Sequence, residues 1–350
     1  MTQRIWAGLL AVPLLLALWV TALLIPLPYV TYEPGLTVDI LDSSGGEEII
    51  QVSGHKTYRD NGELRLTTVF VPRPESDVNL FQLMEAWVSP DDAVYPRRVV
   101  YPKGETDEAS QKEGALQMVS SQDAAVAVAL TELGIDYTAA PKIVAVDPKA
   151  PAQGELKAGD LVLAVGGEPV TTSAQVEKAV RASGAGNPLD LRIERSGHER
   201  TVTVTPEDRD GTPRVGIELF PSYRFPFQVS VGIDDRIGGP SAGLMFSLGI
   251  YDTLTPGSLT GGDVVAGTGE IRASGKVAPI GGIQQKIAAA REEGVTLFLV
   301  PSANCREALG ARNGDVQLVR AARMHDVVAA LEARVDDPEA RLPSCESEAS

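Results

Sequence analysis

Histidine, the usual base of serine proteases, is scarce in this sequence. Only three histidines occur among 350 residues, at His55, His198 and His325, in unrelated contexts. A Ser-His-Asp triad requires a histidine close to its serine, and no serine of the GxSxG type lies near any of them. The HExxH motif of zinc-dependent peptidases is also absent. The scarcity of histidine therefore argues against both chemistries.

Cysteine is rarer still, with only Cys305 and Cys345. There is no CxxC motif and no cluster of cysteine with histidine, so zinc binding is unsupported and we predict neither a metal nor a cofactor. The two cysteines could pair in an oxidising exterior. Because Cys345 lies in a stretch of flexible composition, the sequence alone leaves this pairing open.

Positive charge is also limited. The chain has 31 lysines and arginines against 47 aspartates and glutamates, for a net charge of -16, which argues against a nucleic-acid partner. No phosphate-binding motif GxxxxGK[ST] occurs. The nearest fragment, GTGEIRASGKV at 267–277, has the wrong spacing and lacks the final Ser or Thr. We therefore interpret Lys276 as a charged residue of a β-hairpin and not as a phosphate ligand. We therefore predict no ATP binding.

The sequence does contain one long apolar run, which covers residues 5–27. No charged side chain occurs from Ile5 to Tyr32, and the 23 residues of the run would extend about 34 Å as a helix. That length crosses a hydrocarbon core of about 30 Å, so we expect a single transmembrane anchor. Arg4 precedes the run and acidic residues follow it, which places residues 1–4 in the cytoplasm and the rest outside. A cleaved signal peptide is the alternative, with a weak cleavage pattern at 20–22.

Two regions of different composition follow the predicted anchor. Residues 28–48 contain Gly, Ser and Pro and read as a linker. Residues 49–134 contain a strand pattern at 64–71 and then mostly helical patterns, the last of which ends near Gly134.

Residues 142–205 alternate short strand patterns with turns and contain one helical pattern over 173–183, with Thr172 or Ser173 as its N-cap. The stretch APAQGELKAGDLVLAVGGEPV and the helix after it resemble a bacterial PDZ domain, which we assign to residues 135–208. The resemblance implies that an extended peptide binds as an added strand at an open sheet edge. It also implies a carboxylate-binding loop before Lys142, near residues 134–140.

Residues 213–335 alternate strand and helix patterns, which predicts a layered domain of strands and helices. Residues 336–350 are polar, and we predict that they form a disordered tail. Within this last domain the sequence GGPSAG at 238–243 places Ser241 between a glycine turn and a helix. Such a serine is either an N-cap or a nucleophile, and the helix N-terminus would favour an oxyanion beside it.

A lysine in the same domain has an unusual setting. In PIGGIQQKIAAAREEG, Ile283, Ile287 and Ala290 form an apolar helical stripe, and Lys286 lies beside it. Burial would lower the pKa of Lys286, and a neutral lysine can accept the proton of a serine hydroxyl. The alternative is a surface lysine whose stem covers apolar surface.

Together, GGPSAGLMFSLGIYDTL and the segment from GTGEI to CREAL resemble the proteolytic domain of the Lon proteases. That resemblance implies a Ser-Lys dyad of Ser241 and Lys286, with the Thr268 hydroxyl beside the amine. The apolar run, the PDZ pattern and SSQDAAVAVAL at 120–130 extend it to the membrane-anchored, PDZ-containing Lon-like proteases of bacteria. Many Lon enzymes carry an acidic residue where this chain has Gly238.

The implied function is an ATP-independent serine endopeptidase that cleaves unstructured peptides or protein tails outside the cytoplasmic membrane. Its PDZ domain would recruit substrate or gate the site. Backbone N–H groups near Ser241, with Gly239 and Ala242 as supporting residues, would bind the oxyanion. Whether the chain forms a homo-oligomer is left open, because the ATPase that helps Lon rings to assemble is missing.

The expected fold is therefore α+β, with an N-terminal transmembrane helix, a PDZ-like β-rich domain and a Lon-type α/β proteolytic domain. The sequence leaves open whether residues 60–72 belong to the proteolytic domain, which would make the PDZ domain an insertion. One rival function is an inert, membrane-tethered PDZ scaffold, although such a protein would be expected to lose Ser241 or Lys286. A trypsin-like protease with a PDZ domain is the other rival, but its catalytic His and GNSGG motifs are absent.

Overall fold

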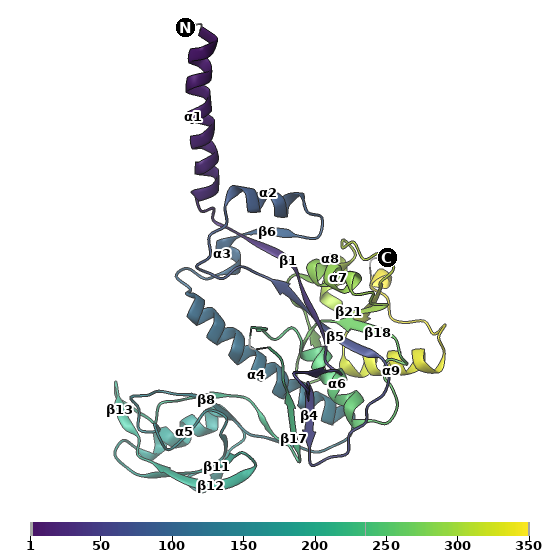
Figure 1. The fold of residues 1–350 in the computed structure, drawn as a ribbon. Helices are drawn as coiled ribbons and strands as arrows, with labels where there is room; N and C mark the ends of the chain where they lie inside the picture. The colour runs from purple at the N-terminus through teal and green to yellow at the C-terminus, as the bar shows by residue number, and fades with distance from the viewer. Residues whose placement is uncertain (1–2, 235, 349–350) are drawn as a thin grey trace.

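A computed structural model describes residues 3–234 and 236–348 of the chain. It contains a large unit built on a six-stranded sheet and a smaller β-rich unit. Figure 1 shows the smaller unit beside the long helix α4, and helix α1 projecting away from both. The bounds of α4 are Asp107–Glu132, and those of α1 are Gln3–Leu24.

Helix α1 coincides with most of the apolar run in the sequence. Its described side chains begin at Leu10, and large apolar residues on it, such as Leu15 and Trp19, are mainly exposed. Among the described residues, the structure has no helix that combines the length and the apolar character needed to span a membrane. The anchor expected over residues 5–27 includes residues 5–9, whose side chains lie outside the described part.

The main sheet combines strands from both ends of the chain. Its order is β22-β21-β18-β5-β1-β6, with β18 parallel to both β5 and β21, and β1 antiparallel to β5 and β6. The strand bounds are β1 Tyr29–Asp39, β5 Glu63–Phe70, β6 Ala93–Pro96, β18 Val264–Gly267, β21 Leu297–Pro301 and β22 Gln317–Ala321.

Strand β1 corrects the expectation of a linker over residues 28–48. The Pro-Gly pair that suggested a linker lies inside this strand, at a shift in its register with β5 between Pro34 and Thr37. Gly35 approaches β5 so closely that a Cβ there would lie 2.4 Å from the Thr68 hydroxyl. Proline and glycine therefore mark an irregular, closely packed strand here rather than a loop.

The pairing of β5 with β18 places residues 63–70 in the same sheet as the C-terminal part of the chain. The smaller unit lies between these two strands in sequence. It is therefore inserted into the larger unit, which is the arrangement that the sequence left open.

Helices cover both faces of the main sheet, and β21 shows how its residues alternate. Leu297 and Leu299 lie in an apolar cluster with residues of α4, α6 and α9, whereas Phe298 and Val300 lie in a second cluster with α7 and α8. This is a layered α/β arrangement within an α+β chain. The helix bounds are α6 Gly243–Leu254, α7 Ile283–Glu292, α8 Cys305–Ala308 and α9 Met324–Asp336.

The smaller unit has the strand order β12-β11-β9-β8-β15, with β10 paired to β9. Helix α5, Ser173–Ser183, covers its core, and Thr172 caps that helix in a capping box with Gln175. The sheet extends beyond the expected boundary at residue 208, because β15 pairs with β8 as the edge strand. The bounds are β8 Lys142–Val146, β9 Leu161–Val165, β10 Glu168–Pro169, β11 Leu189–Arg195, β12 His198–Val204 and β15 Ile217–Phe220.

Short elements complete the described chain. The helices are α2 Leu80–Val88 and α3 Arg97–Val100, with 3₁₀ turns at Ser302–Asn304 and Cys345–Glu348. The strands are β2 Ser43–Ser44, β3 Glu47–Glu48, β4 Ile50–Ser53, β7 Thr138–Ala139, β13 Glu207–Arg209, β14 Thr212–Arg214, β16 Tyr223–Arg224, β17 Gln228–Val231, β19 Glu270–Ile271 and β20 Val277–Ala278.

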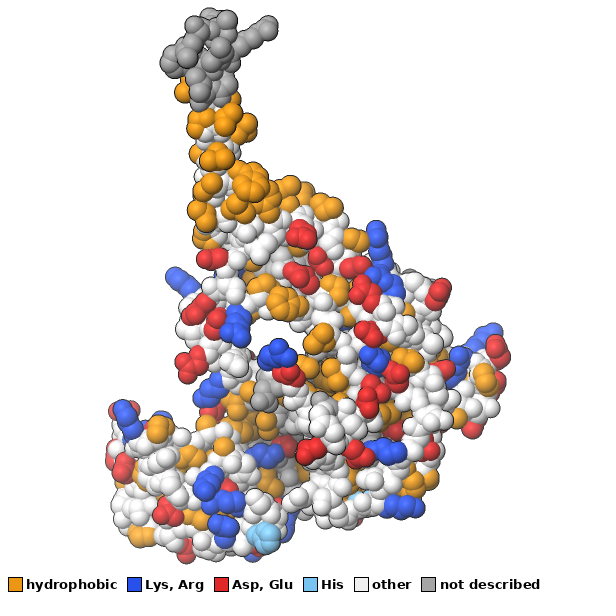
Figure 2. All heavy atoms as spheres, in the orientation of Figure 1, with side chains coloured by type: hydrophobic (Ala, Val, Ile, Leu, Met, Phe, Trp, Pro, Cys, Tyr) orange, Lys and Arg blue, Asp and Glu red, His pale blue; other side chains and the backbone are white. Residues whose placement is uncertain are grey.

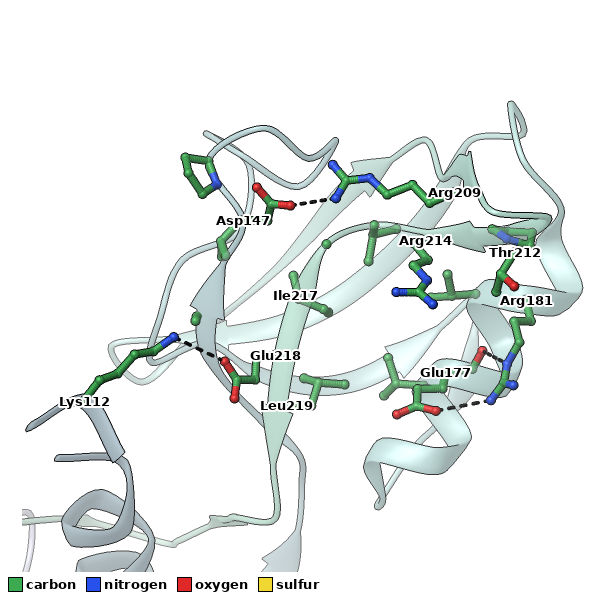
Figure 3. Close-up of a pocket in the computed structure, with 18 residues that line it drawn as sticks. Lys112, Asp147, Glu177, Arg181, Arg209, Thr212, Arg214, Ile217, Glu218 and Leu219 are labelled. Atoms are coloured by element: carbon green, nitrogen blue, oxygen red, sulfur yellow. Dashed lines mark hydrogen bonds and ion pairs between the residues drawn. The ribbon is translucent and has the colours of Figure 1, made fainter. Parts of the chain in front are cut away.

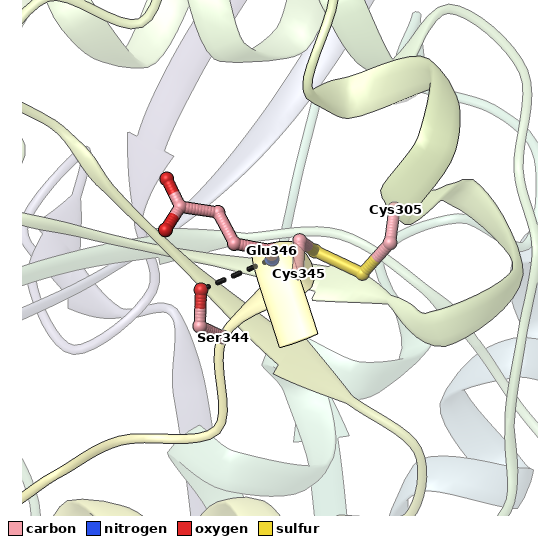
Figure 4. Close-up of a disulfide and its surroundings, with 4 residues drawn as sticks. All are labelled: Cys305, Ser344, Cys345 and Glu346. Carbon is pink, nitrogen blue, oxygen red and sulfur yellow. Dashed lines mark hydrogen bonds between the residues drawn. A yellow bond between two sulfur atoms is a disulfide. The ribbon is translucent and has the colours of Figure 1, made fainter. Parts of the chain in front are cut away.

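The C-terminal segment differs from the disordered tail expected over residues 336–350. Cys345 forms a disulfide with Cys305 of α8 and is buried (Figure 4). The carbonyl of Pro343 accepts a hydrogen bond of 2.8 Å from the N–H of Arg320 in β22. A covalent bond and main-chain pairing thus hold a polar segment that composition alone suggested to be disordered.

We predict that removing the disulfide by the double substitution Cys305→Ser and Cys345→Ser destabilises the larger unit. The disulfide links residues 40 positions apart, and a loop of this size typically contributes about 2–4 kcal/mol. Urea unfolding should show a lower midpoint for the variant, and reductant should lower the wild-type midpoint to the same value. Equal midpoints for wild type and variant without reductant would contradict the prediction.

Candidate active site

Ser241 lies in a turn immediately before α6. The N-cap position of α6 is Ala242, and no side chain caps this helix. The Ser241 hydroxyl instead accepts a hydrogen bond of 3.1 Å from the Lys286 amine. The N-cap interpretation of Ser241 is therefore wrong, and its hydroxyl is directed at a potential base.

Helix α4 holds the loop that precedes Ser241. The N–H of Gly239 donates to the Gly114 carbonyl at 3.0 Å, and Gly239 has a φ of 88°, which favours glycine. The Pro240 carbonyl accepts hydrogen bonds from the Ser121 hydroxyl at 3.1 Å and from the N–H of Gly243 at 3.3 Å. The loop is thus attached to α4 at Gly239 and at Pro240.

Lys286 is the fourth residue of α7 and is only 3% exposed. Its amine donates to the Thr67 carbonyl of β5 at 2.5 Å and to the Ser241 hydroxyl at 3.1 Å. The stripe of Ile283, Ile287 and Ala290 is fully buried, as the sequence predicted. Lys286 is therefore not a surface lysine, because its amine lies inside the domain between the sheet and the Ser241 turn.

Burial lowers the pKa of Lys286 from 10.5 to about 7. No carboxylate forms an ion pair with this amine in the described part of the chain, so no counter-charge there offsets the desolvation of its charged form. A large fraction of the amine is consequently neutral near pH 7. A neutral amine has a lone pair that can accept a proton from the hydroxyl beside it.

Thr268 lies at the site, but in a different role from the one that the resemblance implied. Its buried hydroxyl donates to the Ser241 carbonyl at 2.9 Å, and the N–H of Gly269 donates to the same carbonyl at 2.7 Å. No hydrogen bond between Thr268 and Lys286 occurs within residues 3–234 and 236–348. The amine is oriented by the Thr67 carbonyl instead, a contact that the sequence reasoning missed.

The backbone N–H groups near Ser241 differ in their availability. Gly239 was expected as a supporting donor, but its N–H already donates to Gly114. The N–H groups of Ser241 and Ala242 make no hydrogen bond in the described part of the chain, so both are free to donate a hydrogen bond to an oxyanion. The N–H of Ala242 is therefore available for the expected role, which stays a prediction, whereas the N–H of Gly239 is already engaged.

The three histidines lie outside this site. The ring of His55 lies against Phe227, and His198 contacts the carbonyl of Ser196. His325 pairs with Glu132 at the surface, and that carboxylate raises the pKa of the imidazole. Each histidine thus has a local structural partner away from Ser241.

Family models match two parts of this chain. Residues 235–331 match the Lon protease (S16) C-terminal proteolytic domain, and residues 117–205 match the PDZ domain. The first match contains both Ser241 and Lys286. The chain therefore carries a Lon-type proteolytic domain and a PDZ domain, and these matches support a serine-type peptidase.

Curated relatives match over short stretches. Lon protease from Rhizobium meliloti (strain 1021) is 32% identical over 121 residues, which cover 31% of this chain and 15% of that protein. Zinc metalloprotease RasP from Geobacillus kaustophilus (strain HTA426) is 50% identical over 52 residues, which cover 15% of this chain and 12% of that protein. The chain thus spans less than a fifth of the length of either relative.

A solved structure of the PDZ domain of the SdrC-like protein Lin2157 from Listeria innocua matches at 22% identity and a TM-score of 0.22. It covers 23% of this chain and 92% of that domain.

The low pKa of Lys286 generates a prediction about stability. The amine titrates at about 7 in the folded chain and at 10.5 as an ordinary lysine, so unfolding takes up a proton between these pH values. Wild-type stability should therefore gain roughly 1.4 kcal/mol per pH unit from this group across that window. Lys286→Met, which does not titrate, should be more stable than wild type at pH 7, with a difference that closes towards pH 10.5.

Urea unfolding at several pH values between 7 and 10.5 measures this difference. The matched control is Lys276→Met, which replaces an exposed lysine of the same unit and should show no such pH-dependent difference. If the free energies of unfolding of wild type and Lys286→Met differ by the same amount at every pH between 7 and 10.5, the pKa of Lys286 is not lowered.

Proposed function

We propose that this chain is a serine endopeptidase that works without ATP, with Ser241 as nucleophile and Lys286 as general base. The observation that carries the proposal is the buried amine of Lys286, 3.1 Å from the Ser241 hydroxyl, with its pKa lowered to about 7. An inert scaffold has no need to keep an uncompensated amine inside the domain, since such burial is costly.

In the first step, neutral Lys286 takes the hydroxyl proton of Ser241 while the serine oxygen attacks the scissile carbonyl. The carbonyl oxygen becomes an oxyanion, which the free N–H groups of Ser241 and Ala242 stabilise. One such donor is typically worth about 3 kcal/mol. The Thr67 carbonyl accepts a hydrogen bond from the amine before and after proton transfer, so the base keeps its orientation.

In the next step, the Lys286 ammonium gives its proton to the leaving amine, and an acyl-enzyme ester on Ser241 remains. Water then attacks this ester while Lys286 accepts its proton. Lys286 returns that proton to the Ser241 oxygen as the ester bond breaks and the second product leaves. Thr268 holds the Ser241 backbone throughout by its hydrogen bond to the carbonyl.

The proposed substrates are unstructured peptides and protein tails. The sequence has no GxxxxGK[ST] motif for ATP, and unfolding of stable proteins requires an energy source. A substrate that is already extended needs none.

The smaller unit has a cavity that suits a peptide-binding role. A cavity of about 700 Å³ lies between α5 and β15 (Figure 3), and Ile217 and Leu219 of β15 line it together with Val176 and Val180 of α5. Because β15 is the edge strand, an extended peptide could pair with it. The cavity lies beside residues 212–219, not at the loop expected near 134–140.

Membrane attachment is a further part of the proposal. It is supported by the charge-free run over residues 5–27 and by the exposed apolar side chains on α1 from Leu10 onwards (Figure 2). With residues 1–4 in the cytoplasm, the catalytic unit would act outside the cytoplasmic membrane.

Replacing either dyad residue should abolish cleavage of an unstructured peptide. We expect Ser241→Ala, which lacks the nucleophile, and Lys286→Arg, whose guanidinium keeps its proton, to lower kcat/KM by at least about 1,000-fold. The assay uses the full chain with a mixture of quenched fluorescent peptides.

Ser247→Ala is the matched control, because Ser247 is a buried serine of α6 whose hydroxyl donates within its own helix. This variant should keep nearly full activity. If Ser241→Ala cleaves the peptides as fast as wild type, Ser241 is not the nucleophile. If wild type cleaves none of them, the chain is the inert scaffold.

The pH dependence of cleavage follows from the neutral base. Since only the deprotonated amine can accept the serine proton, kcat/KM should rise through a midpoint at pH about 7 and level off above it. A substrate without groups that titrate between pH 5 and 9 isolates this effect. A profile that keeps rising towards pH 10.5 would show that burial does not lower the pKa of Lys286.

A further inference from the structure

Ser121 is a buried side chain of α4 that the proposed reaction does not use directly. It is 4% exposed, and its hydroxyl donates to the Pro240 carbonyl at 3.1 Å. Pro240 is the residue before the proposed nucleophile. A side chain 120 positions earlier in the sequence thus contacts the backbone beside Ser241.

This hydrogen bond is not the usual one for a hydroxyl on a helix. Helical serine and threonine commonly donate to a carbonyl one turn earlier, and Thr131 of α4 does so, bonding the Ala127 carbonyl at 2.8 Å. Ser121 instead reaches across to another element. Because a buried hydroxyl without a partner is costly, its contact with Pro240 helps to fix the distance between α4 and the loop.

The packing around Ser121 leaves its hydroxyl little freedom. A Cβ added to Gly243, at the start of α6, would lie 2.8 Å from the Ser121 oxygen and 2.8 Å from Ile271. Only glycine at this position allows α6 to approach α4 so closely. The hydroxyl is therefore held against the beginning of α6 and the Pro240 carbonyl.

The hydrogen bond from Ser121 to the Pro240 carbonyl also sets the orientation of the Ser241 N–H, because both groups belong to the Pro240–Ser241 peptide plane. The chain has no cis peptide bond in its described part, and in a planar trans peptide the C=O and N–H point in opposite directions. Proline fixes φ but leaves ψ free. Holding the Pro240 carbonyl towards α4 therefore turns the N–H of Ser241 away from α4.

We infer that Ser121 is a positioning residue for the proteolytic reaction, which orients the Ser241 N–H by fixing the Pro240–Ser241 peptide plane. This inference rests on the proposed function, in which that N–H stabilises the oxyanion. Ser121 touches neither the substrate nor the base, and it acts only through this peptide plane.

Removing the hydroxyl should weaken transition-state stabilisation and leave substrate binding unchanged. In Ser121→Ala the Pro240 carbonyl keeps only the longer hydrogen bond from Gly243, so the peptide plane can rotate. Complete loss of one oxyanion donor costs about 100- to 1,000-fold in kcat. Because the hydrogen bond from Gly243 still partly fixes the peptide plane in Ser121→Ala, we expect a smaller loss of about 10- to 100-fold in kcat, with KM unchanged.

The experiment compares full-length wild type, Ser121→Ala and Gln122→Ala. Gln122 is a matched control, because it is the next residue of α4 and its amide donates to the Val231 carbonyl of β17 rather than to the loop. Three quantities are measured: kcat and KM for an unstructured peptide, the Ki of a peptide boronate that forms a tetrahedral adduct, and the thermal midpoint.

The positioning role predicts that kcat falls and the boronate Ki rises by similar factors in Ser121→Ala alone. The midpoint of the pH profile should stay at about 7, because Lys286 is unaffected. Alanine favours helix, so the variant should fold.

An unchanged kcat with a lower thermal midpoint, as in Gln122→Ala, would overturn the inference and leave the proposed function intact. A rise in KM without a change in kcat would overturn it equally. If wild type neither cleaves peptides nor reacts with a fluorophosphonate at Ser241, the proposed function and the positioning role fail together.

Discussion

The desolvated amine of Lys286 is the constraint on which the rest of the site depends. A charged ammonium at this place would need a carboxylate or water, and its polar contacts here are one carbonyl and one hydroxyl. The neutral form is therefore favoured, and it is also the form that can activate Ser241. Burial favours the neutral, reactive form of the base but lowers the folding stability of the chain, which is a common compromise in active sites.

The fold brings together three elements that are far apart in the sequence to create this environment. Strand β5 supplies the Thr67 carbonyl, α7 supplies the amine, and the turn before α6 supplies the hydroxyl. The parallel pairing of β5 with β18 makes this possible, because β18 leads directly to Thr268 beside Ser241. The smaller unit is inserted between these elements in sequence, and α4 connects it to the loop at Pro240. Asp123 of α4 also pairs with Lys142 of the smaller unit.

Side-chain chemistry made part of this site predictable from the sequence. Ser241 and Lys286 stand in distinctive glycine-rich and apolar contexts, and both reach the site. Thr67 could not be found in this way, because it contributes a backbone carbonyl that any residue would supply. Thr268 was expected at the right place but contacts the serine carbonyl instead of the amine. At the level of the fold, β1 was mistaken for a linker because its Pro-Gly pair lies in an irregular strand, and the tail was mistaken for disorder because composition does not reveal a disulfide.

Whether Lys286 is neutral near pH 7 is the central claim, and the amine itself can report on it. Nuclear magnetic resonance of the full chain, with ¹³C at the lysine ε-carbons and Lys286→Arg to assign the signal, follows its protonation directly. The account predicts a titration midpoint at about 7. A midpoint near the ordinary lysine value of 10.5 would contradict the claim, because the amine would then be charged when Ser241 needs a base.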